Sequence, residues 1–320
     1  MLRTEQLQHW LRSEMPQFDW PLKLLAGDAS FRRYYRLKAA DMSYVIMDAP
    51  PEKESCEAFV AIARSFQDLG LKVPQIFAQD LTKGFLLLSD FGDTLYSDVL
   101  NDATADALYG RALREILRLQ TAEHFGDYTL PSFDDALFHR EFNLFADWYL
   151  IKEKKHPLSE HDRADLLKKY DTLTAEIQKQ PQVCVHRDYH SRNLMLLPNQ
   201  ELGILDFQDA VRGPITYDAL SLLRDCYVDW PQERVQNWLR EFHHELLAQK
   251  RLKDPSFDLF EEQFDYVSAQ RHIKCLGIFT RLLHLYERPN YMQYVPRTQN
   301  YLRLVCEKHS ALSPFLDYFS

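Results

Sequence analysis

The chain has 320 residues, of which 46% are hydrophobic, so it can bury one large or two modest cores. Its net charge of −9 is spread without long charged runs, which argues against nucleic acid or an anionic membrane as the main partner. Without an apolar run of about 18 residues, a signal-like N-terminus or a CxxC among its five cysteines, it is expected to be globular, cytoplasmic and without disulfides.

The first 90 residues predict a short opening helix and then a strand-rich region with one central helix. Polar and apolar residues alternate in 31–37, and the apolar run at 43–49 ends at two prolines; both patterns are typical of strands. Residues 54–70 have the apolar spacing of a helix that ends at a glycine. Two further strands are predicted at 72–80 and 84–89.

From residue 104 onward the pattern changes to long helical periodicity. Three segments carry it, at 104–125, 133–154 and 159–180, and only residues 183–206 interrupt it. That interruption has two short apolar runs around a polar loop and predicts one hairpin region. The fold class expected is therefore α+β and two-lobed. A small antiparallel-sheet lobe is expected at residues 1–91, and a larger, mainly helical lobe at 92–320.

The polar loop contains the pattern H-x-D-x-x-x-x-N, formed by His186, Asp188 and Asn193, and Asp206 ends the next apolar run. A carboxylate such as Asp188 can orient a substrate hydroxyl and accept its proton. The amide oxygen of Asn193 and the carboxylate of Asp206 are hard oxygen ligands, which suit the magnesium ion that bridges nucleotide phosphates. The spacing therefore predicts phosphoryl transfer that uses ATP and Mg²⁺.

The stretches HRDYHSRN and ILDFQ, downstream of a strand-rich region, resemble the catalytic and metal motifs of the aminoglycoside phosphotransferase and choline kinase superfamily, which shares the protein-kinase-like fold. More narrowly, the chain resembles bacterial anomeric kinases that phosphorylate N-acetylmuramate and N-acetylglucosamine at C1 in cell-wall recycling. The stretches that carry this resemblance are GDASFRRYYRL, MDAPPEKE, HRDYHSRNLM and DFQDAVRGPITYDALSLLRD. It implies a sugar 1-kinase whose partners are a nucleotide and a small-molecule sugar, and we expect a monomer.

The triplet Asp90-Phe91-Gly92 matches the metal-binding triplet of protein kinases, but in this fold the metal-binding aspartate follows the catalytic loop. The triplet here precedes the loop and ends the last strand of the predicted small lobe. We therefore expect Ser89, Asp90 and Phe91 to form the hinge whose backbone binds adenine. His186 is expected to orient the catalytic loop through hydrogen bonds.

The phosphate end of the predicted nucleotide site departs from the usual pattern, since no G-x-G-x-x-G is present. The residues expected there instead are Gly27, Ser30, Arg32 and Arg33. The strand at 44–48 lacks the phosphate-binding lysine that the fold places there. Arg32, Arg33 or Lys53 can supply that charge, with Glu54 or Glu57 as its anchor.

Further candidate substrate contacts are Arg187, His190, Arg192, Asp209 and Arg281. A late helix also carries cations, including Arg271 and Lys274, at spacings that point some of them into a cleft; the alternative is a solvated helix face. The lactyl carboxylate of N-acetylmuramate would suit a planar guanidinium.

Two alternatives to the sugar kinase remain open. One is a kinase for another small-molecule hydroxyl, such as that of an aminoglycoside, choline or a lipopolysaccharide core sugar. The other is a catalytically inactive nucleotide-binding regulator, which the missing lysine suggests. The intact set of Asp188, Asn193 and Asp206 argues against a regulator.

Overall fold

The structure is a computed structural model, and it describes residues 2–16, 22–26, 31–39 and 42–318. Contacts between residues divide the chain into two compact units. The first unit is Met1–Thr94, His124–Thr129 and Met195–Gln208; the second is Leu95–Glu123, Leu130–Leu194 and Asp209–Ser320. The two lobes at 1–91 and 92–320, placed by the change from strand to helix patterns, remain a prediction.

The first unit is built on a five-stranded antiparallel sheet in the order β1-β2-β3-β5-β4. Its strands are β1 (Lys23–Ala26), β2 (Arg33–Ala39), β3 (Met42–Asp48), β4 (Ile76–Asp80) and β5 (Phe85–Ser89). The central pair β2/β3 runs in register from Arg33 opposite Asp48 to Ala39 opposite Met42. Every strand predicted in this region is present, because alternation of side chains between two faces is a signal local to the sequence.

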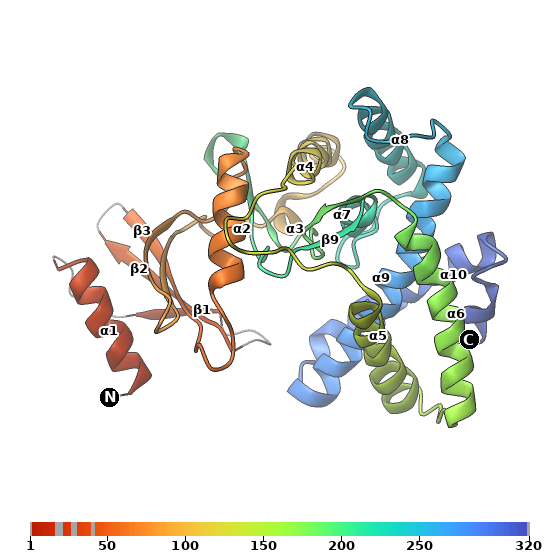
Figure 1. Ribbon diagram of the computed structural model, residues 1–320, viewed down its shortest axis with the longest axis horizontal. Coiled ribbons are helices and arrows are strands. Elements are labelled where there is room, and N and C mark those ends of the chain that lie inside the picture. Colours follow the sequence, from red (N-terminus) through yellow and green to blue (C-terminus); the bar gives the residue numbers. More distant parts are fainter. Residues whose placement is uncertain (1, 17–21, 27–30, 40–41, 319–320) are drawn as a thin grey trace. The chain divides into compact units, whose positions relative to one another are not determined.

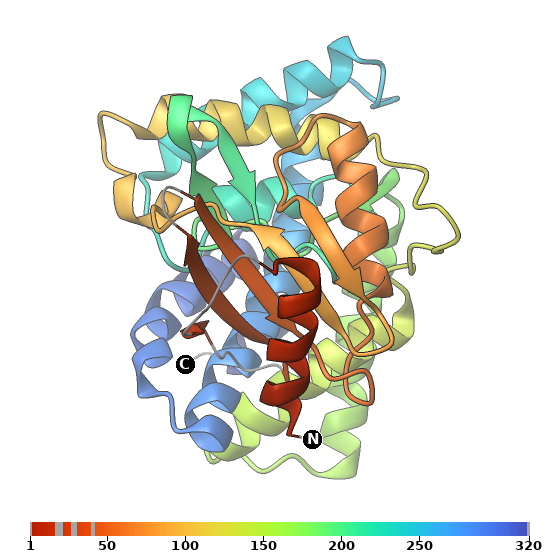
Figure 2. The same ribbon diagram turned by 90° about the vertical axis from the view of Figure 1, so that its left-hand side faces the viewer.

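Two helices flank this sheet (Figure 1). On one face, α1 (Arg3–Glu14) buries Leu7, Trp10 and Leu11 in one cluster with Ile46 of β3 and with other strand residues. Figure 2 shows α1 lying across the sheet. On the other side lies α2 (Glu57–Asp68), the central helix predicted from its apolar spacing, with a buried stripe that includes its phenylalanines. The sheet is therefore covered on both faces, which fixes its strands rigidly.

A later segment of the chain completes the first unit. Strand β7 (Leu194–Leu196) pairs with β8 (Leu202–Ile204) around the short helix η2 (Pro198–Gln200). The backbone N–H of Ile204 donates to the carbonyl of Lys72, 2.8 Å away, which ties β8 to the segment before β4. This segment ends at residues 205–208, which include one of the predicted metal ligands.

The second unit is mainly helical and centres on the 30-residue helix α9 (Phe257–Tyr286), around which α5, α6 and α10 gather in Figure 1. Its other helices are α3 (Tyr96–Val99), α4 (Ala105–Leu119), α5 (Asp135–Leu144), η1 (Phe145–Glu153), α6 (Glu160–Gln178), α7 (Tyr217–Leu223), α8 (Gln232–Ala248), η3 (Pro289–Tyr294), α10 (Val295–Lys308) and η4 (Ser313–Tyr318). Gly277 of α9 packs directly on the junction of α5 and η1. A Cβ there would lie 2.4 Å from the carbonyl carbon of Leu144.

The hairpin region predicted at 183–206 is formed differently. Strand β6 (Gln182–Val185) pairs with β9 (Val211–Pro214), and β8 pairs with β7, so the two apolar runs do not pair with each other. Strand β9 was not predicted, because a glycine and a proline in four residues do not read as a strand. The loop between β6 and β7 is therefore not the turn of a hairpin.

No helix in the described part of the chain is long and apolar enough to cross a membrane. All five cysteines are buried and none forms a disulfide, which confirms the prediction of free buried thiols.

Candidate active site

The catalytic loop, residues 186–193, coils tightly after β6. The backbone N–H of His190 donates to the carbonyl of Asp188 at 3.1 Å, and that of Asn193 donates to the carbonyl of His190 at 2.9 Å. The side-chain amide nitrogen of Asn193 also donates to the carbonyl of Asp188 at 2.9 Å. One short, cross-linked loop therefore holds the predicted base and one predicted metal ligand in fixed positions.

Two buried carboxylates anchor this loop. Asp218, on α7, accepts the backbone N–H of His186 at 2.7 Å and that of Arg187 at 3.0 Å. Asp225, just after α7, accepts both the N–H and the hydroxyl of Ser191, at 2.9 and 2.5 Å. Burial raises the pKa of Asp218 to about 6, against the opposing pull of the nearby His186.

The carboxylate of Asp188 has two unlike oxygens. Its Oδ1 lies 3.3 Å from Nη1 of Arg271 and 3.4 Å from Nζ of Lys274, both on α9. Its Oδ2 accepts no hydrogen bond from the described residues, and the side chain is 34% exposed. Two cations thus fix one oxygen and leave the other without a hydrogen bond from the described residues, so that it can accept one from a substrate hydroxyl.

The same cations set the ionisation of Asp188. Burial by itself would raise its pKa, but the charges of Lys274, Arg271 and Arg187 outweigh that effect and hold the pKa well below its ordinary value. Asp188 is therefore a carboxylate at neutral pH. It can orient and polarise a hydroxyl at all times, but it is a weak base.

A second carboxylate, Glu141 of α5, balances part of this charge. Its two oxygens accept from Nη2 of Arg187 and from the amide nitrogen of Gln270, each at 2.7 Å. Lys274 lies 3.4 Å from it. Three cations, Arg187, Arg271 and Lys274, thus pair with two carboxylates, Glu141 and Asp188, in a largely buried cluster. The charge of Arg271 also acts on the two carboxylates that anchor the loop, Asp218 and Asp225.

The two histidines of the loop serve its geometry. His186 is fully buried, and its Nδ1 accepts the backbone N–H of Asp188 at 3.3 Å. The ring of His190 meets the ring of Tyr227 edge to face at 5.0 Å. Burial and the charge of Arg271 lower the pKa of His190 to about 3, so this ring is neutral. These contacts support the predicted orienting role of His186.

The two predicted metal ligands, Asn193 and Asp206, lie in different units and are described one at a time. In the second unit, Asn193 donates its amide nitrogen within the loop, to the carbonyl of Asp188. In the first unit, Asp206 adopts a left-handed backbone, φ 61°, and one carboxylate oxygen accepts from the amide of Gln208 at 2.8 Å. Phe207 next to it is buried between Phe59 and Phe66 of α2, with ring centroids 4.8 and 5.9 Å away.

Among the described residues, no three His, Cys, Asp or Glu side chains gather in a way that could hold a metal ion. A magnesium ion that used one carboxylate and one amide oxygen would depend on nucleotide phosphates and water for its other ligands, as this ion usually does.

At the predicted phosphate end, Arg32 forms an ion pair with Glu54, with 2.6 Å between Nε and Oε2. The other oxygen of Glu54 accepts the backbone N–H of Phe31 at 3.1 Å. Lys53 lies instead over the ring of Phe31, 5.2 Å from its centroid, and Arg33 is exposed. Gly27 and Ser30 lie outside the described residues.

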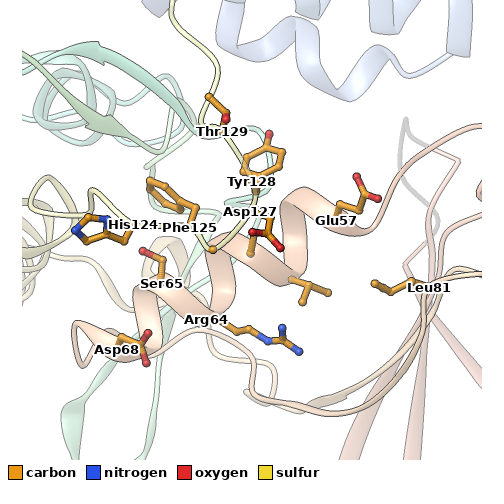
Figure 3. A pocket seen from close by; sticks show the side chains of 13 residues that line it. Glu57, Arg64, Ser65, Asp68, Leu81, His124, Phe125, Asp127, Tyr128 and Thr129 are labelled. Carbon is orange, nitrogen blue, oxygen red and sulfur yellow. The ribbon is translucent and has the colours of Figure 1, made fainter.

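The second candidate anchor, Glu57, lies elsewhere. It lines a hollow of about 820 Å³ within the first unit, formed by α2 and residues 124–129 (Figure 3). No predicted catalytic or metal residue lines this hollow. The ion pair of Arg32 therefore singles out Glu54 as its anchor.

In the predicted hinge, the side chain of Asp90 is occupied by other groups of the first unit. Its oxygens contact Nε of Arg36 at 2.6 Å, the hydroxyl of Ser43 at 2.5 Å and the backbone N–H of Gly92 at 2.9 Å. A carboxylate with these partners fixes the end of β5, which agrees with an aspartate that does not bind the metal.

The other two hinge residues also make structural contacts. Ser89 and Gln75 exchange two hydrogen bonds of 2.9 Å, one through the hydroxyl of Ser89. The ring of Phe91 packs on Gly203 of β8, where a Cβ would lie 2.7 Å from the ring. Gly203 thus permits the close approach of this ring.

The five candidate substrate residues lie in different surroundings, all in the second unit. Arg187 and His190 belong to the charged cluster and the loop described above. Asp209 is exposed, and its carbonyl accepts from Arg187 at 3.2 Å. Arg281 lies far along α9 against Tyr286, 5.8 Å from its ring centroid, while Arg192 lies over Tyr227 at 4.6 Å.

Several residues of this site were not predicted as such. They are Glu141, Asp218, Asp225, Arg271 and Lys274. For Arg271 and Lys274 the sequence carried a signal, since their spacing of three places both on one side of a helix. Asp218 and Asp225 fall within a stretch that was quoted for its resemblance, which is an indirect signal. Glu141 had no signal in the sequence.

Comparison with known proteins agrees with this geometry. Residues 21–255 match the model of a family described as "Phosphotransferase enzyme family". The chain is 41% identical to an N-acetylmuramate/N-acetylglucosamine kinase of Pseudomonas aeruginosa, over 97% of this chain and 94% of that protein. It is 37% identical to a protein of the same name from Neisseria meningitidis, over 98% and 94% of the two chains.

Among solved structures, the fold is similar to that of a choline/ethanolamine kinase family protein of Mesorhizobium loti. The TM-score is 0.65 with 13% identical residues, and the match covers 99% of both chains. This likeness confirms the predicted α+β, protein-kinase-like fold.

Proposed function

Because the chain belongs to the phosphotransferase enzyme family, we propose that it transfers the γ-phosphoryl group of ATP to the anomeric hydroxyl of N-acetylmuramate or N-acetylglucosamine. The observation that carries this proposal is the arrangement of Asp188. Arg271 and Lys274 fix its Oδ1, and its Oδ2 accepts no hydrogen bond from the described residues. The relatives named for these two sugars, which match nearly the full length of this chain, support the choice of acceptor.

In the proposed reaction, the anomeric oxygen attacks the γ-phosphorus while the bond from that phosphorus to the β,γ-bridging oxygen breaks. The proton of the hydroxyl passes to Oδ2 of Asp188 and then to solvent, and the products are a sugar 1-phosphate and ADP. A weakly basic carboxylate is adequate, because an anomeric hydroxyl is more acidic than an ordinary alcohol. Asp188 then contributes mainly by orienting the attacking oxygen.

Asn193 and Asp206 are the proposed protein ligands of magnesium. When bound to ATP, Mg²⁺ neutralises phosphate charge in phosphoryl transfer. Asn193 would offer its amide oxygen, since its amide nitrogen is held by the carbonyl of Asp188. Asp206 would offer carboxylate oxygen from a position that the buried Phe207 keeps in place.

Arg32 is the proposed replacement for the missing phosphate-binding lysine. A cation paired with a carboxylate keeps its position, and Glu54 supplies that carboxylate at 2.6 Å. The backbone of residues 89–91 is proposed to bind adenine, and the turn that contains Gly27 and Ser30 is proposed to cover the phosphates. The sugar 1-phosphate would then enter cell-wall recycling.

The test is ADP release by the purified chain with ATP and Mg²⁺ and one acceptor at a time: N-acetylmuramate, N-acetylglucosamine, choline or kanamycin. We expect turnover with the two sugars only, and its loss in Asp188→Asn with nucleotide binding retained. Turnover with choline or kanamycin alone would reject the proposed acceptor. ATP binding without turnover on any acceptor would favour the inactive regulator.

A further inference from the structure

Arg192, in the second unit, is a cation that lies against two aromatic rings. Its guanidinium carbon lies 4.6 Å from the ring centroid of Tyr227 and 5.6 Å from that of Tyr294. The rings of Tyr227 and Tyr294 themselves meet edge to face at 4.8 Å. Two rings thus hold the planar group in place and leave its N–H groups available.

The guanidinium of Arg192 makes no ion pair and no hydrogen bond within the described part of the chain. This distinguishes it from the neighbouring arginines of the site, since Arg187 pairs with Glu141 and Arg271 pairs with Asp188. The side chain is partly exposed, as are Tyr227 and Tyr294. An oriented and accessible guanidinium without an acidic partner suits a ligand carboxylate, to which it can donate two parallel hydrogen bonds.

Arg192 also lies beside the reacting group. It is in the same coiled loop as Asp188, directly before Asn193, which contacts the carbonyl of Asp188. The ring of His190, two residues after Asp188, packs on the same Tyr227.

We propose that Arg192 binds the carboxylate of an acidic acceptor sugar and so makes the enzyme prefer N-acetylmuramate, which carries a lactyl carboxylate, over the neutral N-acetylglucosamine. The inference rests on the proposed function, and it names Arg192 as the residue that determines acceptor preference. Tyr227 and Tyr294 act through Arg192 as positioning residues. They also offer aromatic faces near the sugar ring.

The test varies the protein and the ligand together. Steady-state kinetics would be measured for wild type, Arg192→Gln and Arg192→Lys with N-acetylmuramate, its uncharged amide and N-acetylglucosamine. Arg303→Gln is the matched control, because Arg303 is an arginine of α10 paired with Glu307 away from the loop. The loss of one charged, hydrogen-bonded contact with the substrate should lower kcat/KM roughly tenfold.

We expect Arg192→Gln to raise KM for N-acetylmuramate roughly tenfold or more while kcat and the constants for N-acetylglucosamine stay within about twofold. Wild type should lose a similar factor when the amide replaces the acid, and Arg192→Gln should no longer distinguish the two. Arg192→Lys should fall between, because it keeps the charge without the planar geometry. The control should behave as wild type.

An equal loss with both sugars, or no change with either, would overturn the inference. A raised KM for ATP in Arg192→Gln would overturn it too, since Arg192 would then bind phosphate. The comparison of acid and amide on wild type needs no variant, so it stays decisive if a substitution disturbs folding. A wild-type enzyme inactive on both sugars would instead reject the proposed function.

Discussion

At the scale of single residues, Lys274 and Asp188 are coupled through a partly buried ion pair of 3.4 Å. Lys274→Met should lower the free energy of unfolding of the wild type by about 1–3 kcal/mol. The same substitution should lower it by less in the Asp188→Asn variant, where this ion pair has already been lost. The coupling energy from urea unfolding of the two single variants and the double variant measures the pair. Lys179→Met, at an exposed pair with Glu176, should change stability by at most about 1 kcal/mol. Strict additivity of the two substitutions would contradict the described contact.

The same scale includes the contact of Arg32 with the nucleotide. Arg32→Gln should raise KM for ATP roughly tenfold or more and leave KM for the sugar nearly unchanged, because it removes a charged contact to phosphate. Lys38→Gln, an exposed lysine on β2, is the control. Kinetics with varied ATP, supported by direct nucleotide binding, would measure the effect. A larger effect from Arg33→Gln would transfer the role to that residue.

At the scale of elements, Asp218 connects α7 to the catalytic loop, and its raised pKa of about 6 gives the enzyme a pH dependence. As pH falls through about 6, the carboxylate gains a proton and loses acceptor capacity for two backbone N–H groups. We expect kcat to fall there.

Stability should respond to the same proton with the opposite sign. The folded-state pKa lies above the unfolded value of about 3.9, so the folded state binds the proton more readily between these values. The contribution of Asp218 to stability therefore increases as pH falls from about 6 to about 4.

Asp218→Asn should lower kcat roughly tenfold, because one backbone N–H would lose its acceptor, and should remove the inflection near pH 6. An inflection that persists in this variant belongs to another group.

Helix α9 carries Arg271 and Lys274, and its position depends on close packing at Gly277. Gly277→Ala should destabilise the protein by about 1–3 kcal/mol, because the new Cβ would lie 2.4 Å from the backbone of Leu144, which has little room to move. Gly110→Ala on α4 is the matched control. The nearest atom to its new Cβ would be 3.6 Å away, so it should be neutral or stabilising by up to about 1 kcal/mol. The midpoints of urea unfolding of the two variants measure this difference. Equal midpoints would contradict the close packing at Gly277.

At the scale of the whole molecule, patterns local to the sequence predicted most of the fold. The strands of the first unit, the long helices of the second and the H-x-D-x-x-x-x-N loop each follow from periodicity or spacing within about 20 residues. The family resemblance added the protein-kinase-like fold and the class of enzyme, and both are confirmed. The roles of the individual site residues stay predictions.

What could not be predicted depends on contacts between distant parts of the chain. The spacing of Arg271 and Lys274 placed both on one side of a helix, but nothing local indicated that they meet Asp188, more than 80 residues earlier. Glu141 was not predicted for the same reason. Strand β9 exists because β6 supplies its partner, so its own four residues carry little signal.

The most direct test of the central claim is phosphorus NMR of the purified protein with ATP, Mg²⁺ and N-acetylmuramate. The account predicts a new sugar phosphate signal whose phosphorus is coupled to the anomeric proton, formed together with ADP and absent with Asp188→Asn. A phosphorus coupled to a proton at any other sugar position would contradict the proposed site of transfer. Formation of ADP and inorganic phosphate without a sugar phosphate would contradict the kinase itself.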